Sequence, residues 1–407
     1  MRIVIAAENG KNLGFLLDNS RLLEVFPADD APGTFHVGDI ILGRVRDVVP
    51  SLKACFVNIT MSGDKHVDMA AGFLPFYDCV GANTGMKPEM VLPVQITAMP
   101  SGSKPCRLSA KLNIAGKYCV VGTGISGVSI SRKLDNIVSS SLKDIVSSSK
   151  EARSLSEHGF GVIVRTNAGR FATASAEESE DTEILLGEIS DLDSQLAGII
   201  ADSRTRVQGT VLYSSPGLLA QKIMNNEPEE VLIDESAVNN CFDLQNISTQ
   251  GKTRKVAGSM AVMGIKRQLD EGLARRVWLK SGAYLVIDHT ESLTAVDVNS
   301  GKAVIKGRRN DDAVAAKMAY DVNKEAAYEV FRQMRLRNIS GMILVDFINM
   351  DSEYTDRLSI ILNSLADKDP VHAGFVDFTG LGLAEITRKK EGQRLEELVV
   401  DTAGTKL

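Results

Sequence analysis

Leu293-Thr294-Ala295-Val296-Asp297 is an apolar β-type run that ends in an aspartate, and residues 342–346 repeat this form, ending at Asp346. A charge at the exit of a buried strand is costly unless something compensates it, and a divalent cation held by two carboxylates compensates it directly. Asn299 offers a further oxygen two residues after the first run. Hard oxygen ligands suit Mg²⁺ or Mn²⁺. The pair therefore predicts a metal site, with two ordinary turn-capping aspartates as the alternative.

Basic residues follow the first aspartate, with no acid between Val298 and Asn310. Positive side chains beside a metal ion suit phosphodiester chemistry, because they hold substrate phosphates while the metal activates water and offsets charge on the leaving oxygen. The alternative is a solvated loop. The basic residues are Lys302, Lys306, Arg308 and Arg309.

Length and charge set the broad class of the protein. A chain of 407 residues predicts about two to four domains with a sizeable core. The net charge of -6 argues against a general polyanion binder. However, residues 102–134 carry six basic residues and no acid, and residues 177–193 carry eight acids and no base. This segregation permits a basic groove, or two solvated faces.

Composition also bears on the compartment. No apolar run approaches the length that spans a bilayer, and the first residues lack the apolar core of a signal peptide, so we expect a cytoplasmic protein without membrane insertion. The cysteines form no CxxC pair and predict buried free thiols, and the scattered histidines predict no zinc site. The cysteines are Cys55, Cys79, Cys106, Cys119 and Cys241.

Periodicity along the chain predicts a mixed α/β protein. Residues 2–6 and 13–17 favour two strands joined by a turn at residues 8–10. Short β-rich stretches between residues 39 and 110, punctuated by Gly and Pro, are typical of a small barrel. Residues 182–200 have a helical apolar period. Further on, the pattern favours a hairpin around Ser281-Gly282 and a helix that begins at an N-cap near Asn310 and runs to about Arg335.

Two aromatic residues in the predicted barrel are candidates for RNA contact. Phe56 and Phe73 lie on neighbouring β-rich segments, and Lys53, Lys65, His66 and Lys104 are nearby in sequence. Barrels of the OB type stack unpaired bases on such rings. Packing of both rings in the core is the alternative.

Several segments, taken in order, resemble the ribonuclease E/G family. Residues 283–288, 293–302, 341–348 and 381–390 are similar to its catalytic segments. Residues 38–45 with 54–57 resemble its embedded S1 domain, and Val164-Arg165-Thr166 resembles its 5′ sensor.

The resemblance implies an RNase H-like subdomain that is split by an inserted S1 barrel and a 5′ sensor, followed by a DNase I-like catalytic subdomain. The boundaries that we predict are 1–34 and 206–270 for the two parts of the RNase H-like subdomain, 35–110 for the S1 barrel, 111–205 for the 5′ sensor, 271–400 for the catalytic subdomain, and 401–407 for a tail.

The resemblance also implies roles for individual residues. Asp297 and Asp346 would bind catalytic Mg²⁺, with Asn299 in support. Arg165 and Thr166 would hold a 5′-monophosphate, and Phe56 would contact RNA. The other implied residues are Gly116, Val120 and Arg132 for the 5′-phosphate, and Phe73 and Lys104 for RNA.

We therefore expect a single-strand-specific endoribonuclease that cuts A/U-rich stretches of mRNA and of rRNA or tRNA precursors. Cleavage would leave 5′-phosphate and 3′-hydroxyl ends, a 5′-monophosphate would stimulate it, and the role would be RNA processing and decay. A catalytically weakened RNA-binding scaffold or regulator is the alternative, and a metal-dependent deoxyribonuclease is a third interpretation.

Three departures from the family pattern bear on these expectations, and one of them is that residues 351–353 are more acidic than is usual in the family. The sequence ends at Leu407 without the CPxC-type zinc link, so we expect no structural Zn²⁺ and favour a homodimer over a zinc-dependent tetramer. Asn349 stands where the family usually has a second aspartate, which removes one local negative charge.

Overall fold

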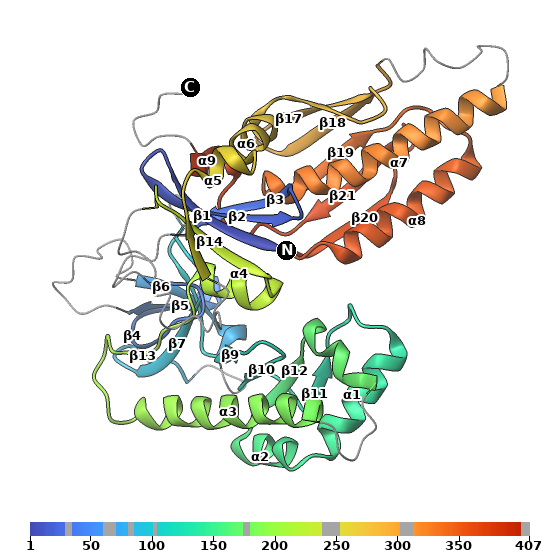
Figure 1. The fold of residues 1–407 in the computed structure, drawn as a ribbon. Coiled ribbons are helices and arrows are strands. Elements are labelled where there is room, and N and C mark those ends of the chain that lie inside the picture. Colours follow the sequence, from blue (N-terminus) through green and yellow to red (C-terminus); the bar gives the residue numbers. More distant parts are fainter. Residues whose placement is uncertain are drawn as a thin grey trace. The chain divides into compact units, whose positions relative to one another are not determined.

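The computed structural model describes residues 1–28, 35–59, 71–79, 85–100, 104–173, 180–237, 253–301 and 312–399. The chain forms two compact units, one of Met1–Pro32 with Leu218–Leu407 and the other of Gly33–Gly217. Within the described residues the strands form four sheets, two in each unit (Figure 1). The prediction of a mixed α/β protein is confirmed.

The first sheet joins strands that precede residues 33–217 in the sequence with strands that follow them. Its strand order is β15-β14-β1-β2-β3, with β1 antiparallel to β2 and parallel to β14. Asn9 and Gly10 link β1 to β2 with φ angles of 51° and 75°, the left-handed conformations that a tight hairpin turn needs. The strands are β1 (Arg2–Glu8), β2 (Lys11–Asp18), β3 (Arg21–Pro27), β14 (Glu230–Asp234) and β15 (Thr253–Val256).

Helices bury both faces of this sheet. Successive β1 residues point to opposite faces, so they pack against different helices. Ile3 and Ile5 pack with α4, whereas Val4 and Ala6 pack with α6 and α9. The helices are α4 (Leu218–Asn226), α5 (Ser259–Val262), α6 (Ile265–Leu273) and α9 (Leu395–Val399).

The second sheet of this unit carries both candidate aspartates. Its order is β16-β17-β18-β19-β21-β20, and α7 connects the parallel strands β18 and β19. The hairpin around Ser281-Gly282 is confirmed, since β16 pairs antiparallel with β17. The strands are β16 (Arg276–Trp278), β17 (Tyr284–His289), β18 (Leu293–Asn299), β19 (Gly341–Asp346), β20 (Ala373–Phe378) and β21 (Leu383–Arg388).

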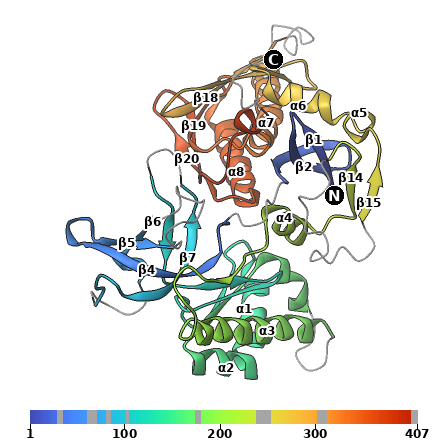
Figure 2. The same cartoon turned by 90° about the vertical axis from the view of Figure 1, so that its left-hand side faces the viewer.

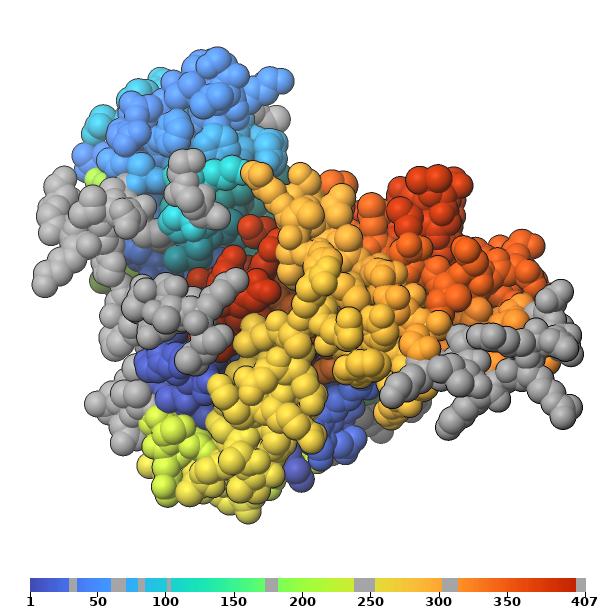
Figure 3. All heavy atoms as spheres, turned by 90° about the horizontal axis from the view of Figure 1, so that it is seen from above, coloured from blue at the N-terminus to red at the C-terminus, as the bar shows by residue number. Residues whose placement is uncertain are grey.

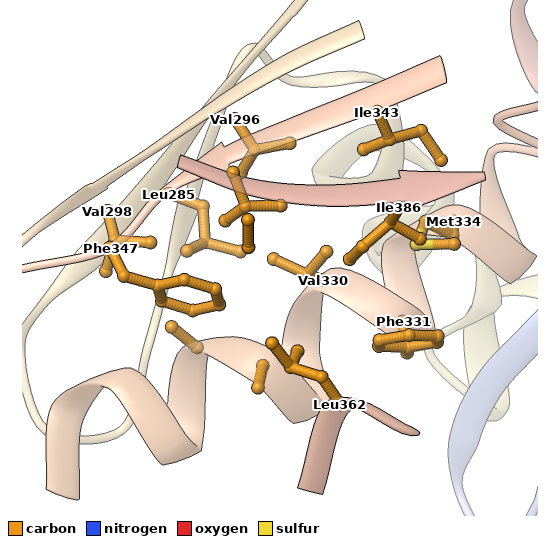
Figure 4. Packing of buried hydrophobic residues seen from close by; sticks show 14 of the residues in the cluster. Leu285, Val296, Val298, Val330, Phe331, Met334, Ile343, Phe347, Leu362 and Ile386 are labelled. Atoms are coloured by element: carbon orange, nitrogen blue, oxygen red, sulfur yellow. The ribbon is translucent and has the colours of Figure 1, made fainter. Parts of the chain in front are cut away.

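Two helices, α7 (Asp312–Leu336) and α8 (Ser352–Lys368), cover one face of the second sheet. Figure 4 shows Val296 and Ile343 of the sheet packed in the same core as Val330 of α7 and Leu362 of α8. The alternate residues point to the other side, which we call the open face, and Ala295 and Met342 are exposed there. The predicted cap of α7 at Asn310 lies outside the described residues, and the helix ends at Leu336, one residue past the predicted end.

The other unit contains a closed barrel. Strand β4 pairs with both β5 and β7, which closes the ring β4-β5-β6-β8-β7, and β13 adds to β4 outside it. A closed five-stranded barrel fits the predicted S1-like domain. The elements are β4 (Ile40–Val49), β5 (Ala54–Asn58), β6 (Ala71–Pro75), β7 (Val91–Ala98), β8 (Arg107–Ser109), β13 (Val211–Tyr213), η1 (Pro50–Leu52) and η3 (Phe76–Asp78).

The barrel is followed by a four-stranded sheet of order β11-β12-β10-β9. Figure 2 shows α1, α2 and α3 gathered beside this sheet, and α3 confirms the helix predicted at 182–200. The elements are β9 (Asn113–Ala115), β10 (Cys119–Gly122), β11 (Val128–Ile130), β12 (Gly161–Val164), α1 (Asn136–Ser148), α2 (Lys150–His158), η4 (Thr166–Thr173) and α3 (Glu180–Asp202).

The described cysteines are free thiols, as predicted. Cys55, Cys106 and Cys119 are buried and Cys79 is half-buried, whereas Cys241 lies outside the described residues. Burial raises the pKa of the Cys55 and Cys106 thiols to about 11, so both stay protonated and unreactive near neutral pH. A separate finding concerns the membrane: none of the described helices has the length and apolar character needed to cross a bilayer.

Candidate active site

The pairing of β18 with β19 places the two candidate aspartates opposite each other. Asp297 and Asp346 are register partners in this parallel pair. Val296, Val298 and Val345 point into the core, so alternation turns both aspartates to the open face, where both are exposed. Neighbouring strands are about 4.8 Å apart, which brings the two side chains within reach of one small ligand.

The two aspartates are exposed, and the prediction that they leave a buried strand is wrong. The sequence suggested charges that leave a buried strand, apolar on both sides, but Met342 on the same strand is 54% exposed and both carboxylates meet solvent. Among the described helices, α7 and α8 pack on the other face of the sheet, so burial imposes no cost on these charges. Their juxtaposition does impose one, because like charges directly opposite each other on neighbouring strands repel.

Asn299 is joined directly to the first aspartate. Its Nδ2 donates a hydrogen bond of 2.6 Å to Oδ2 of Asp297, two residues earlier on the same face of β18. This bond orients the carboxylate and leaves its other oxygen for a ligand. Asn299 Oδ1, the oxygen that the sequence interpretation offered as a further ligand, takes no part in this bond, so that interpretation stays a prediction beside the positioning contact.

The donor set fits a hard divalent cation. Mg²⁺ is usually held by one or two carboxylates and keeps several waters. In the part of the chain that the structure describes, no group of three or more His, Cys, Asp or Glu side chains is arranged to hold a metal ion. The basic residues Lys302, Lys306, Arg308 and Arg309, predicted to hold phosphates, lie outside the described residues.

A second group of predicted residues meets at one end of the sheet of β9 to β12. Arg165 directly follows β12, and its Nη1 donates a hydrogen bond of 2.6 Å to the carbonyl oxygen of Gly116. Burial lowers the pKa of Arg165, and the nearby Glu188 carboxylate opposes this effect. An arginine remains charged in proteins. The arrangement thus presents a partly buried cation at the end of the sheet.

Hydroxyl groups lie beside this arginine. Thr166 Oγ1 is 2.9 Å from the Ser131 hydroxyl oxygen, and the exposed Arg132 follows Ser131 in the chain. Val120 lies within β10, opposite Ile163 of β12. The structure therefore brings Gly116 into contact with Arg165, and Thr166 next to Ser131.

Sequence reasoning missed Glu188, which shapes the loop that carries Gly116. Its carboxylate oxygens accept hydrogen bonds from the backbone N–H groups of Lys117, Tyr118 and Cys119, at 3.0, 2.7 and 2.9 Å. A Cβ on Gly116 would collide with this carboxylate. The acidic stretch that contains Glu188 gave no signal of the role, since its partners lie about 70 residues away.

Replacing Glu188 by alanine should lower the free energy of unfolding by about 2 kcal/mol, because three backbone donors lose a charged acceptor. Glu188→Gln, which keeps one acceptor oxygen, should lose about half as much. Urea unfolding measures both, with Glu183→Ala at an exposed position of the same helix as the matched control. Equal stability of Glu188→Ala and the unmutated protein would show that the contacts do not hold this loop.

The barrel residues form a surface pair. Phe56 and Phe73 are register partners on β5 and β6, with ring centroids 5.9 Å apart. Both are half-buried and lie outside the buried core of the barrel, and Arg46 approaches the Phe56 ring to 5.7 Å. Lys104 is exposed, and its predicted neighbours Lys65 and His66 lie outside the described residues. The two rings are thus placed for stacking.

The chain combines a barrel, a sheet with two opposed aspartates and a sheet with an arginine at one end. Comparison with known proteins identifies the class of protein to which it belongs. Residues 113–391 match the model of the ribonuclease E/G family, and the chain therefore belongs to that family.

Individual relatives agree. The chain is 28% identical to ribonuclease E of Synechocystis sp., over 98% of this chain and 58% of the relative. It is 30% identical to ribonuclease E of Nostoc sp., over 91% of this chain and 54% of the relative. Ribonuclease G of Escherichia coli is 30% identical, over 91% of this chain and 76% of the relative. The chain thus spans little more than half the length of the two ribonuclease E relatives.

Proposed function

We propose that this chain is an Mg²⁺-dependent endoribonuclease that cuts single-stranded, A/U-rich RNA in RNA processing and decay. One observation carries the proposal: Asp297 and Asp346 face each other on the open side of a sheet, in a chain of the ribonuclease E/G family. The substrates would be mRNA and precursors of rRNA or tRNA. The products would carry 5′-phosphate and 3′-hydroxyl ends.

The two aspartates would hold the cation, with Mn²⁺ as a possible substitute. Bound there, it would supply Lewis-acid stabilisation of the charge on the phosphate and activation of a water molecule. Asn299 fixes the orientation of Asp297 through its 2.6 Å hydrogen bond. The exposure of both carboxylates leaves room for an RNA backbone, which a buried pair would exclude.

The other predicted residues would hold the RNA strand. Phe56 and Phe73 would stack on unpaired bases, which selects single strands because paired bases hide their faces. Lys104 would contact phosphates at the barrel. Arg165 would bind a 5′-monophosphate through charge-assisted hydrogen bonds that a 5′-hydroxyl cannot form, with Thr166 beside it.

The subdomain assignment belongs to the same proposal. The sheet of β1–β3 with β14 and β15 supports an RNase H-like subdomain split by an insertion, and the barrel supports the S1 domain. The sheet of β9–β12 would be the 5′ sensor, and the sheet of β16–β21 the DNase I-like catalytic subdomain. We also propose a homodimer, by analogy with the family.

A fluorescent, 5′-monophosphorylated, A/U-rich oligonucleotide tests the activity. With Mg²⁺ the protein should give discrete fragments with 3′-hydroxyl ends, and chelation of the metal should stop cleavage. Binding without cleavage would favour the RNA-binding scaffold, for which Asn349 in the family's acidic segment is the motivating residue. Equal cleavage of single-stranded DNA would favour a deoxyribonuclease.

A further inference from the structure

An exposed aromatic cluster lies on the open face, at the edge of the sheet that carries the aspartates. Trp278 is the single tryptophan of the chain and is 60% exposed. Its ring centroid is 5.1 Å from that of Tyr284, and the Arg276 guanidinium lies 5.8 Å from the Trp278 ring and 4.5 Å from the Tyr284 ring. We call these three residues the Trp278 cluster.

Local sequence explains why the cluster points outward. Val277 is buried in the core between Arg276 and Trp278, so alternation turns both neighbours to the open face. Tyr284 is the register partner of Trp278 on β17 and points the same way. A single exposed apolar side chain is ordinary on a protein surface, but two rings held together by a guanidinium form an ordered platform.

Strand register connects the cluster to the candidate active site. One row across the sheet runs from Arg276 through Val286 to Asp297 and then to Asp346. The next row runs from Trp278 through Tyr284 to Asn299. Trp278 thus lies on the same face as Asp297, two strands across and two residues along, which is about 12 Å. In the space-filling view the yellow to amber atoms of this part of the chain lie at the surface (Figure 3).

We propose that Trp278 stacks on an unpaired base of the RNA strand, at a nucleotide flanking the phosphate that lies at Asp297 and Asp346. This inference rests on the proposed function and adds a base-binding position within the catalytic sheet. Aromatic rings stack on bases of any sequence, and a neighbouring arginine attracts the phosphates that accompany them. Arg276 gives the cluster one positive charge, and the two aspartates nearby carry negative charges. This charge pattern suits an RNA strand whose phosphate is bridged to the carboxylates by a cation better than it suits an apolar partner.

Tryptophan fluorescence gives a direct test, because all tryptophan emission comes from Trp278. The unmutated protein of residues 1–407 is titrated with a single-stranded A/U-rich oligonucleotide, in chelator so that the RNA stays intact. Stacking should quench the emission, and the quenching should saturate at the same Kd as the anisotropy of the labelled RNA. A duplex of the same sequence should quench far less.

Variants test the contribution to binding. Trp278→Ala should weaken RNA binding about tenfold, or 1.4 kcal/mol, within the range measured for stacked bases. Trp278→Phe, which keeps a ring, should bind within about threefold of the unmutated protein. Tyr328→Ala removes another exposed ring, 52% exposed on α7, and should leave binding unchanged.

An abasic nucleotide, placed in turn at each position near the cleavage site, locates the base. At one position the missing base should weaken binding to the unmutated protein about as much as Trp278→Ala does. The same abasic RNA should bind the Trp278→Ala variant no more weakly than intact RNA does. Equal losses at that position in both proteins would overturn the proposal.

The tryptophan emission shows whether the stacking proposal fails independently of the proposed nuclease function. RNA binding with unchanged emission would overturn the stacking proposal even if the protein cleaves RNA. Quenching without cleavage on addition of Mg²⁺ would retain the stacking site and reject the nuclease. Emission that changes with protein concentration in the absence of RNA would mean that a second copy of the chain covers Trp278, and would also overturn the proposal.

Discussion

Replacing Asp297 or Asp346 by asparagine should lower the rate of RNA cleavage by about 1000-fold or more. An asparagine keeps the size of the side chain but removes the charge that holds a divalent cation, and a factor of 1000 corresponds to about 4 kcal/mol of transition-state stabilisation. A metal ion can supply several kcal/mol of this kind. Single-turnover cleavage of a 5′-monophosphorylated oligonucleotide measures the rate.

Metal and RNA binding show whether the loss has this cause. Each variant should lose its calorimetric signal for Mn²⁺ or Mg²⁺, while RNA binding in chelator stays within about twofold. Asp288→Asn is the matched control, because Asp288 lies on the same sheet but is paired with Arg275 through bonds of 2.6 and 2.7 Å. Cleavage by Asp297→Asn at the unmutated rate would remove the proposed metal site.

Replacing Arg165 by alanine should abolish the preference for a 5′-monophosphate over a 5′-hydroxyl substrate, a preference that we expect to be about 10- to 100-fold in kcat/KM. A single charge-assisted hydrogen bond that contributes about 1.5 to 3 kcal/mol accounts for a factor of this size. The 5′-hydroxyl substrate should be cut at an unchanged rate, because it offers no terminal phosphate. Paired measurements of kcat/KM on the two substrates give the ratio.

Conservative and distant variants control for local disruption. Arg165→Lys keeps the charge but loses the planar fork that also reaches the Gly116 carbonyl, so it should retain only part of the preference. Arg153→Ala, at an exposed position of α2, should retain all of it. If the unmutated protein cuts both substrates equally, the 5′-sensor assignment fails.

The sequence predicted the elements of the catalytic sheet but not how they meet. The apolar β-type runs at residues 293–297 and 342–346 were enough to predict two strands that end in aspartates. Their register depends on how the sheet packs against α7 and α8, and those contacts involve residues far away in the chain. The opposition of Asp297 and Asp346 is therefore a finding of the structure.

Two further points lay beyond local pattern. The sequence interpretation buried the aspartates, because an apolar run looks the same whether helices cover one face of its sheet or both. It also considered the acidic stretch around Glu188 only as part of a charge segregation, either a basic groove on an acidic protein or two solvated faces, although this carboxylate accepts three backbone hydrogen bonds from a distant loop. By contrast, the turn at Asn9-Gly10 was predictable because only local backbone geometry decides it.

The parallel pairing of β1 with β14 has a consequence for biosynthesis. Residues 2–5 must wait for residues 230–233 before their outer edge is hydrogen-bonded, so more than half of the chain leaves the ribosome first. The Gly33–Gly217 unit has no such requirement and can acquire its structure in the meantime. Pairing across so large a sequence separation is intrinsically slow. The N-terminal hairpin therefore spends the longest time as an open, apolar edge and is the segment where chaperone assistance would count most.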